Sequence, residues 1–396
     1  MTLSQKLAAR KRLFTALVLI ALLPLQGRAQ SHSAFPVDIV AGPAPQPVMA
    51  DGRAHLLYEL HLTNFSASQI ELLALDVLGE DSAAPLASYH GQELEKLLVP
   101  IGQTGSIEKA RAIGGGRGVM IYVDLTLPGD ARPPMQLLHR LSLSIPRKKD
   151  GSGGTIENTV NGPVVATVQE AAPVLRAPLR GSTWIAFNSL GGDDHRRALN
   201  PVDGKARIAQ RFAIDWMSLG PDGRLLHGDP KSNTSFYDYG AEVLAVADGR
   251  ISDLKDGLPE NAGSNEASSR NITLDNVVGN YLILDLGRGR FALYAHLQPG
   301  SLRVKLGDRV KVGQALARLG NSGNSDAPHL HFQVMDANSP LGSEGLPYEI
   351  DGFTQLGVSD DPAVLDSGQA WKPDSKAAPV LHRRDLPVNN AVVTFP

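Results

Sequence analysis

Short stretches in which apolar and polar residues alternate, separated by turn-forming residues, recur along almost the whole of this 396-residue chain. Such period-two alternation is typical of half-buried β-strands, whereas the 3.6-residue period of an amphipathic helix is nearly absent. A chain of this length is too long for one ordinary domain, and we expect roughly two or three. The patterning therefore predicts an all-β protein with more than one domain.

The amino-terminal part of the chain contains the first set of predicted strands. Four segments stand out, namely His55–Leu62, Gln69–Val77, Gly118–Leu125 and Leu137–Ile145. Turn signals at intervals of roughly ten residues favour a β-sandwich, of the immunoglobulin-like type. We therefore predict a β-sandwich accessory domain over residues 31–165, followed by a linker over residues 166–190.

Residues 1–29 have the layout of a secretory signal peptide. A basic start that includes Lys6 and Arg10 precedes an apolar run from Leu13 to Leu25, and small residues follow at Gly27 and Ala29. This order predicts cleavage after Ala29 and a secreted protein, either periplasmic or extracellular. The alternative is an uncleaved signal anchor, for which the apolar run is short.

The composition excludes some classes of partner. The formal net charge is -3 and the chain has no Cys. Without a basic surface the chain lacks the electrostatic signature of a nucleic-acid-binding protein. The sequence after the predicted signal peptide has no extended apolar segment, so we expect no stable membrane insertion after signal cleavage. In an oxidising compartment the fold would depend on packing, because disulfides cannot form.

A denser series of strands follows in the second half of the chain. Ile208–Trp216 is predicted to be a strand, and Glu242–Ile251 a strand with a tight Asp-Gly turn that leads into the next one. Asn280–Leu286 and Arg290–Leu297 are predicted to form a hairpin, and Gly307–Leu316 a turn followed by a strand. The first of them contains Asp215, a carboxylate that is costly to bury without a partner. Between it and the second lies an insertion, residues 217–240, rich in Gly, Pro, Asp, Ser and Asn. A loop of that length in a compact domain is usually functional, which favours a lid over a groove.

The segment Gly320–Val334 contains the strongest single motif. A loop rich in Gly, Asn and Ser leads through Pro328 into a predicted strand that carries His329 and His331. Side chains two residues apart on a strand point to the same face, so one imidazole could hold a metal while the other contacts a ligand on it. Two surface histidines on a strand are the alternative that this motif alone leaves open.

Taken in order, five segments resemble the lysostaphin/LytM-type zinc metallopeptidases, whose β-rich domain cuts peptide cross-links in bacterial cell walls. The matching segments are Arg211–Asp215, Gly240–Gly249, Tyr294–Leu297, Gly307–Gln314 and Gly320–Val334. The resemblance implies a LytM-type β-sheet peptidase domain, a sandwiched-barrel hybrid, which we place at residues 191–350. Residues 351–396 then form a carboxyl-terminal extension.

The resemblance also implies roles for individual residues. In the family, zinc is held by the His and Asp of a His-x-x-x-Asp strand and by the second His of His-x-His. Carried over, Asp215 and His331 are metal ligands. His296 and His329 correspond to the two catalytic histidines, which polarise the zinc-bound water and stabilise the oxyanion.

One position departs from the family pattern, because Arg211 stands where the family has its first metal-binding His. A guanidinium cannot ligate a cation and would repel zinc. His195, in the loop before this strand, is our preferred replacement ligand; His227 in the insertion, or no third protein ligand, are alternatives. In a metal-free site Arg211 could instead pair with Asp215.

We therefore expect a secreted zinc metallo-endopeptidase with one Zn²⁺ per chain, acting on peptide bonds in peptidoglycan cross-links or in another peptide substrate. The alternative is a metal-free, catalytically degenerate relative that binds wall peptides or regulates another cell-wall hydrolase. Arg211 favours the alternative, whereas the presence of His296, His329 and His331 together favours the enzyme.

Overall fold

The computed structural model describes residues 35–82, 84–101, 110–128, 131–147, 153–264, 271–361, 365 and 367–396. All of these belong to one compact unit, Phe35–Pro396. The predicted signal peptide, residues 1–29, lies outside the described residues. The helical elements of the described part of the chain are α1 (Gly91–Lys96) and the 3-10 turn η1 (Asn233–Ser235), and Leu365 is also helical. The prediction of an all-β fold is confirmed.

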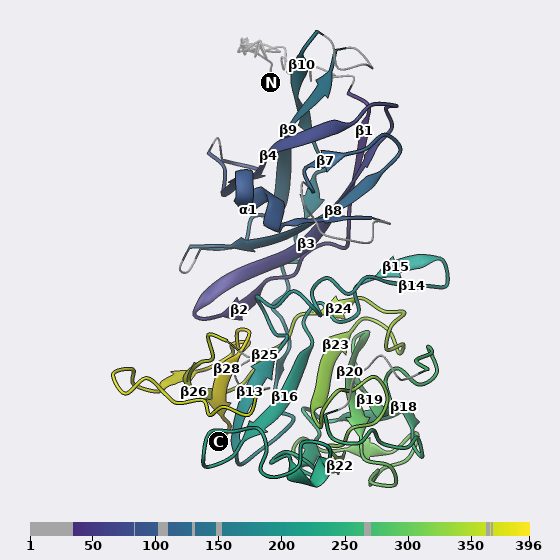
Figure 1. Ribbon diagram of the computed structural model, residues 1–396, viewed down its shortest axis with the longest axis vertical. Coiled ribbons are helices and arrows are strands. Elements are labelled where there is room, and N and C mark those ends of the chain that lie inside the picture. Colours follow the sequence, from purple (N-terminus) through teal and green to yellow (C-terminus); the bar gives the residue numbers. More distant parts are fainter. Residues whose placement is uncertain are drawn as a thin grey trace, which may run out of the picture. The chain divides into compact units, whose positions relative to one another are not determined.

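Two antiparallel sheets form the amino-terminal part of this unit (Figure 1). The first consists of β1 (Val37–Ala41), β2 (Val48–Ala50), β3 (Arg53–Asn64), β8 (Gly118–Thr126) and β6 (Leu98–Pro100). The second consists of β10 (Thr155–Asn161), β9 (Gln136–Pro146), β4 (Ile70–Gly79), β5 (Ala87–His90), β11 (Val165–Ala166) and β7 (Ala112–Ile113).

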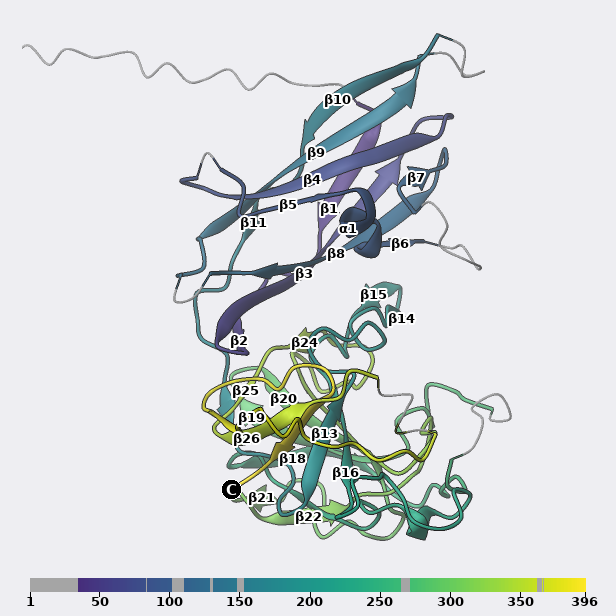
Figure 2. The same cartoon turned by 60° about the vertical axis from the view of Figure 1, so that its left-hand side comes forward.

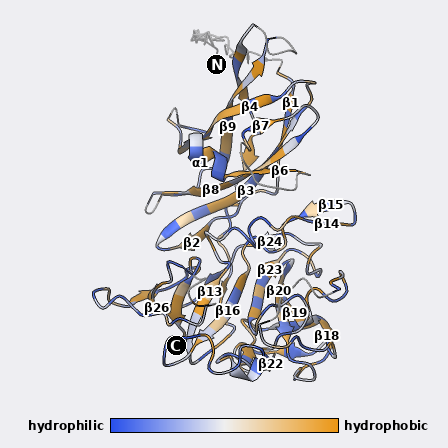
Figure 3. Cartoon of the chain, viewed as in Figure 1, coloured by the Kyte–Doolittle hydropathy of each residue, from blue (hydrophilic) through white to orange (hydrophobic). Residues whose placement is uncertain are grey.

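The two sheets enclose one hydrophobic core, which makes this part a β-sandwich. Leu60 and Val123 from the first sheet and Leu72 and Leu141 from the second belong to one buried cluster. Buried positions alternate with more exposed ones along β4 and β9, as expected for strands with one face on a core. Figure 3 shows the hydrophobic colour on β9 and on other strands. The finer prediction of an immunoglobulin-like sandwich stays a prediction.

A long sheet organises the remainder of the unit, and Figure 2 shows it from a second direction. In spatial order the described residues contribute β21 (Arg309–Val310), β18 (Gly249–Lys255), β19 (Asn280–Gly287), β20 (Arg290–Leu297), β23 (Leu330–Met335), β16 (Ile214–Leu219), β13 (Thr183–Phe187), β28 (Ala391–Thr394), β26 (Phe353–Val358) and β27 (Val380–His382), with β24 (Gly345–Leu346) beside β23.

Three small pairs complete the described strands. They are β12 (Val174–Leu175) with β25 (Glu349–Ile350), β14 (Asn200–Val202) with β15 (Lys205–Arg207), and β17 (Glu242–Leu244) with β22 (Ala315–Arg318). Strands β17 and β22 pack against the long sheet, because Val243 and Leu316 share its main hydrophobic cluster with Trp216, Tyr294 and Phe332.

The predicted strand that contains Asp215 has different bounds in the structure. We predicted a strand over Ile208–Trp216, but β16 begins at Ile214 and continues to Leu219. Residues 208–213 instead form turns, in which the Arg211 N–H donates to the Ile208 carbonyl and the Ala213 N–H to the Gln210 carbonyl. Alternating polarity cannot distinguish a strand from turns whose side chains are buried by more distant parts of the chain.

The predicted domain boundaries remain predictions, and the long sheet crosses two of them. Strand β13 lies in the predicted linker, residues 166–190, and pairs with β16. Strands β26, β27 and β28 lie in the predicted carboxyl-terminal extension, residues 351–396, and β28 pairs with β13. The segments on both sides of the peptidase-like region therefore extend its sheet.

Candidate functional site

The centre of the site is a pair of residues on neighbouring strands. Strands β16 and β23 are antiparallel, and their register sets Asp215 directly opposite His331. Residues that face each other across a strand pair have side chains on the same face of the sheet. The neighbours Ile214 and Trp216 point to the other face, where they are fully buried in the main core. The core therefore fixes the direction of both polar side chains.

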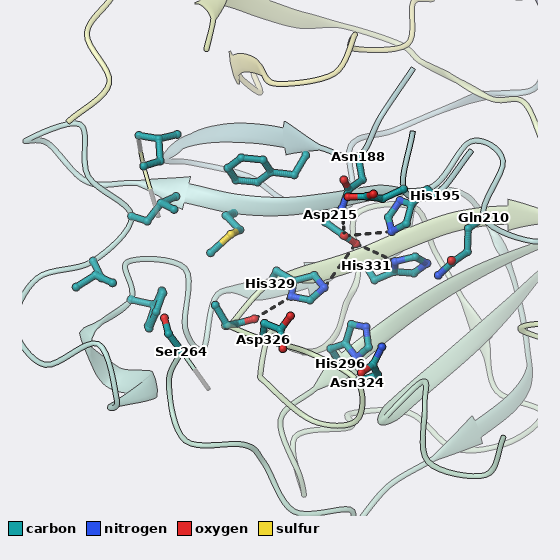
Figure 4. A pocket seen from close by; sticks show the side chains of 18 residues that line it. Asn188, His195, Gln210, Asp215, Ser264, His296, Asn324, Asp326, His329 and His331 are labelled. Atoms are coloured by element: carbon teal, nitrogen blue, oxygen red, sulfur yellow. Dashed lines mark hydrogen bonds and ion pairs between the residues drawn. The ribbon is translucent and has the colours of Figure 1, made fainter. Parts of the chain in front are cut away.

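His195 completes a cluster with these two residues. Its Nε2 lies 3.1 Å from Oδ2 of Asp215, while Nδ1 of His331 lies 2.8 Å from Oδ1 of Asp215 (Figure 4). One ligand atom from each of the three residues lies within 4.8 Å of the other two. The imidazole rings of His195 and His331 meet edge to face at 4.8 Å. Two imidazole nitrogens and a carboxylate oxygen are a donor set that suits Zn²⁺.

Both imidazoles have their second nitrogen engaged elsewhere. Nδ1 of His195 donates to the carbonyl of Ala213 at 3.2 Å, and Nε2 of His331 donates to Oε1 of Gln333 at 2.9 Å. These acceptors assign the tautomers, so that the nitrogens facing Asp215 carry lone pairs in the neutral rings. Lone pairs pointed at a carboxylate repel it unless a proton or a cation lies between them. The arrangement fits a divalent cation.

The electrostatics of Asp215 agree with this picture. Burial would raise the pKa of Asp215, but the adjacent His195 and His329, together with contacts from His195 and His331 in which a proton or a cation lies between ring nitrogen and carboxylate, hold it well below its ordinary value. Burial would lower the pKa of His195, but the Asp215 carboxylate outweighs burial and raises it. The amide of Asn188 also donates to Oδ2 of Asp215 at 2.9 Å. The carboxylate is therefore held ionised in the cluster.

His296 reaches the same face through an unusual backbone conformation. Ala295 pairs with His331 across β20 and β23, so regular alternation would direct His296 to the opposite face. The φ of His296 is 61°, in the left-handed region, which interrupts the alternation. Its ring centroid consequently lies 5.9 Å from that of His331. Such backbone strain is concentrated at functional sites.

His329 lies just before β23, on the other side of the cluster. Its Nδ1 donates to the carbonyl of Ala327 at 2.8 Å, and its Nε2 lies 3.5 Å from Oδ1 of Asp215. In the same way, Nδ1 of His296 donates to the carbonyl of Ser322 at 2.7 Å. The two rings are 4.7 Å apart. Each histidine therefore has Nε2 available for chemistry in the site.

Burial keeps both of these histidines neutral at pH 7. Desolvation, with repulsion from His329 and His331, lowers the pKa of His296 well below its ordinary value. Desolvation also lowers the pKa of His329, although Asp215 opposes it. Neutral imidazoles with a free Nε2 can accept a proton.

These side chains lie in a groove of about 960 Å³. His195, Asp215, His296, His329 and His331 line its polar part. The insertion after β16, which we interpreted as a lid, contributes Leu225, Leu226 and Phe236 to the lining. Leu225 and Phe236 also pack against Ile185 of β13 and Met217 of β16. In this structure the insertion therefore forms an apolar wall that is packed on the sheet.

Arg211 does not enter the cluster. Arg211 is 7% exposed, and its guanidinium forms ion pairs with Glu59 and Glu344 at 2.9 Å each and donates to the carbonyl of Gly345 at 3.1 Å. Arg211 lies in the turns before β16, so the alternation of side chains along a strand does not place it on the same face as Asp215. The metal-free arrangement in which Arg211 pairs with Asp215 does not match these contacts.

The structure brings together the predicted residues Asp215, His331, His195, His296 and His329. His227 is exposed, and its ring lies 4.8 Å from that of Tyr237 at a tilt of 40°. Sequence reasoning missed Asn188 and Gln333. Gln333 follows His331 by two residues on one strand, and that spacing could have identified it. Asn188 follows β13, and only the pairing of β13 with β16 brings it to Asp215.

Sequence comparisons give matches in the second half of the chain. Residues 234–342 match peptidase family M23. The chain is 37% identical over 100 residues to the glycyl-glycine endopeptidase ALE-1 of Staphylococcus capitis, and this match covers 25% of this chain and 23% of the relative. It is 28% identical over 163 residues to the peptidoglycan DD-endopeptidase ShyA of Vibrio cholerae, and this match covers 39% of this chain and 31% of the relative. The chain spans less than a third of the length of these two relatives.

Two solved structures are also similar to this chain. The catalytic domain of the prophage-encoded M23 protein EnpA from Enterococcus faecalis is 20% identical, with a TM-score of 0.26, and the match covers 43% of this chain and 92% of that one. The catalytic domain of lysostaphin from Staphylococcus simulans is 24% identical, with a TM-score of 0.20, and covers 32% and 86% respectively.

The family match includes three of the five site residues, namely His296, His329 and His331, and it begins after Asp215. The departure at Arg211 lies outside the matched residues. The resemblance that the motifs indicated is confirmed, because residues 234–342 of this chain match peptidase family M23 and the named relatives are peptidases.

Proposed function

We propose that this protein is a secreted zinc metallo-endopeptidase that hydrolyses peptide bonds in peptidoglycan cross-links. The observation that carries the proposal is the convergence of Nε2 of His195, a carboxylate oxygen of Asp215 and Nδ1 of His331, with His296 and His329 beside them. A groove that only binds peptides has no chemical need for four imidazoles and a buried carboxylate at one point.

His195, Asp215 and His331 would hold the zinc. Bound there, zinc would supply a Lewis acid that polarises a carbonyl and lowers the pKa of a coordinated water toward about 7. His296 and His329 act from their free Nε2 atoms. In the neutral form each can take a proton from the attacking water, and in the protonated form each can donate to the oxyanion of the tetrahedral intermediate.

The groove and the relatives support a peptide substrate. Leu225, Leu226 and Phe236 form an apolar wall on one side of the histidines, and Asn324 and Asp326 contribute polar groups. Such a groove can accept an extended peptide through both kinds of contact. The two named relatives are endopeptidases, one of them a peptidoglycan DD-endopeptidase, and we infer the same substrate class here.

The proposal includes a location outside the cytoplasm. The sequence of residues 1–29 supports export. The relative ShyA is a peptidoglycan endopeptidase, and peptidoglycan lies outside the cytoplasm. Among the described residues we find no helix with both the length and the apolar character needed to cross a membrane. Peptidoglycan peptides, and not nucleic acid, are the proposed partners.

Removal of the metal provides the first test. Treatment of the purified mature protein with a chelator is expected to abolish release of peptides from peptidoglycan, and added Zn²⁺ is expected to restore it, because the ligand set would be the source of the Lewis acid. Metal content should be close to one zinc per chain. Peptidoglycan binding without hydrolysis at any zinc concentration would contradict the proposal and support the metal-free binding protein.

The two catalytic histidines can be separated from the metal ligands. His329→Ala and His296→Asn are expected to lower kcat by roughly 10²–10⁴-fold, the usual contribution of general acid-base catalysis, while zinc content stays at the unmodified level. Asparagine is preferred at residue 296 because it tolerates the left-handed φ of 61°. Single-turnover rates measured beside metal analysis check this. Unchanged kcat in both variants would remove these residues from the mechanism.

A further inference from the structure

The loop that carries His195 is attached to the β-sandwich by the residues that follow His195. This His195 loop, residues 188–199, connects β13 with β14 and has few regular backbone contacts near its tip. There the Arg197 N–H donates to the Asp193 carbonyl and the Ala198 N–H to the His195 carbonyl. These bonds, and that from the Leu199 N–H to the Arg197 carbonyl, join near neighbours in the sequence. Such local hydrogen bonds do not by themselves fix a loop in one place against its conformational entropy.

Arg196, the residue next to His195, reaches into the β-sandwich. The residue is 8% exposed, and its guanidinium forms an ion pair with Glu59 of β3. It also donates to the carbonyls of Tyr58 at 3.1 Å and Val123 at 3.3 Å. The guanidinium carbon lies 5.1 Å from the centre of the Tyr122 ring of β8, within cation–π distance. Arg196 is therefore held by both central strands of the first sheet.

Arg197 adds a second attachment to the same sandwich. Its guanidinium donates to the carbonyl of Lys96 and lies 5.7 Å from the Tyr122 ring. The Tyr122 hydroxyl in turn donates to the Arg197 carbonyl at 3.5 Å. Tyr122 and Met120 form a small hydrophobic cluster with Ile208, and Leu199 packs against it. Polar and apolar contacts thus join residues 196–199 of the loop to β8.

We propose that the amino-terminal β-sandwich is a positioning element of the metal site, acting through Arg196 and Arg197 on His195. This inference rests on the proposed function. Because Arg196 is bonded to His195 and its side chain is fixed in the sandwich, the imidazole of His195 is confined near Asp215. Preorganisation of a ligand in this way raises metal affinity, since less conformational freedom is lost on binding.

The same network indicates a structural role for Arg211. Glu59 accepts hydrogen bonds from both Arg196 and Arg211, so one buried carboxylate joins the His195 loop to the turns that precede Asp215. The chain thus has an arginine at the position of the family's first ligand, and that arginine supports the contact that holds the replacement ligand. Two of the three ligands are linked through a residue of the sandwich.

The test uses Arg196→Met in the full mature chain. Glu59 keeps its ion pair with Arg211 in this variant, so the buried carboxylate is still compensated and folding is expected. Zinc affinity, measured by competition with a chromogenic chelator, is expected to fall by roughly 10–100-fold, the usual cost of losing an outer partner of a metal ligand. Tyr122→Leu is a second variant, expected to weaken zinc binding in the same direction.

A spectroscopic readout and a matched control separate positioning from general destabilisation. The absorption of the Co²⁺-substituted protein reports the ligand set, and in Arg196→Met it is expected to shift toward that of His195→Ala. The control is Glu344→Gln, which alters the same ion network at Arg211 but does not contact Arg196. It is expected to lower thermal stability while leaving zinc affinity unchanged.

The outcomes are distinguishable. If His195→Ala loses zinc but Arg196→Met and Tyr122→Leu both bind it within about twofold of the unmodified chain, the positioning role is overturned and the proposed function stands. If the unmodified chain itself binds no zinc, the proposed function fails and this inference fails with it. A zinc affinity that falls equally in Glu344→Gln would also overturn the positioning role, since it would show an effect of stability alone.

Discussion

Replacing His331 by alanine is expected to remove zinc and peptidoglycan hydrolysis together. Nδ1 of His331 lies 2.8 Å from Oδ1 of Asp215, and its other nitrogen is held by Gln333, so the alanine variant loses the proposed ligand atom. Loss of an outer partner costs roughly 10–100-fold in metal affinity or activity, and loss of a direct ligand should cost more. Metal analysis and release of soluble wall peptides measure the two effects.

The chain offers a matched control for this experiment. His227 lies in the insertion, is exposed and contacts the ring of Tyr237, so His227→Ala makes the same chemical change outside the cluster. That variant is expected to keep full zinc content and activity, whereas His195→Ala should behave like His331→Ala. Zinc retained in His331→Ala, or lost in His227→Ala, would require a different ligand set from the one proposed.

The sequence was most informative where the chemistry is local. His329 and His331 share a strand, and the alternation of apolar residues around them fixes which face they occupy. The strand that bears Asp215 was predicted to contribute a second ligand, and the observed register places Asp215 opposite His331. The five motif segments occur in a fixed order, which is why the family could be identified despite the departure at Arg211.

Features that depend on distant contacts were not accessible from the sequence. The contacts of Arg211 are with Glu59, 152 positions away, and with Glu344, 133 positions away. No local pattern connects these residues, and so the sequence offered a metal-free pairing with Asp215 as an open alternative. The left-handed φ of His296 also depends on its surroundings, because histidine has only a weak preference for that conformation.

The strands after residue 350 illustrate the same limit. Strands β26, β27 and β28 were predicted as part of an extension, yet β28 pairs with β13 in the long sheet. Val392 of β28 packs in the cluster that also contains Leu225 and Phe236 of the groove wall. Strand pairing between residues about 200 positions apart is set by tertiary packing rather than by propensity. The carboxyl-terminal segment thus supports one wall of the groove.

Glu59 is the residue on which the buried ion network depends. It is 1% exposed, and although burial opposes ionisation, Arg196 and Arg211 lower its pKa to about 2. The carboxylate is therefore charged at any pH near neutrality. Burying ion pairs often brings little net stability, because desolvation costs about as much as the attraction returns. Removing a single partner is different, because the remaining charges stay buried without compensation.

Glu59→Ala is therefore expected to lower the free energy of unfolding by about 3–5 kcal/mol, since Arg196 loses its acidic partner and Arg211 retains only Glu344. Urea unfolding of the full mature chain measures this. Glu71→Ala is the matched control in the same sandwich, where the partner Arg111 lies 3.6 Å away and the Glu71 side chain is 44% exposed. That change should cost less than about 1 kcal/mol. Equal losses in the two variants would show that the buried network adds nothing beyond an ordinary surface pair.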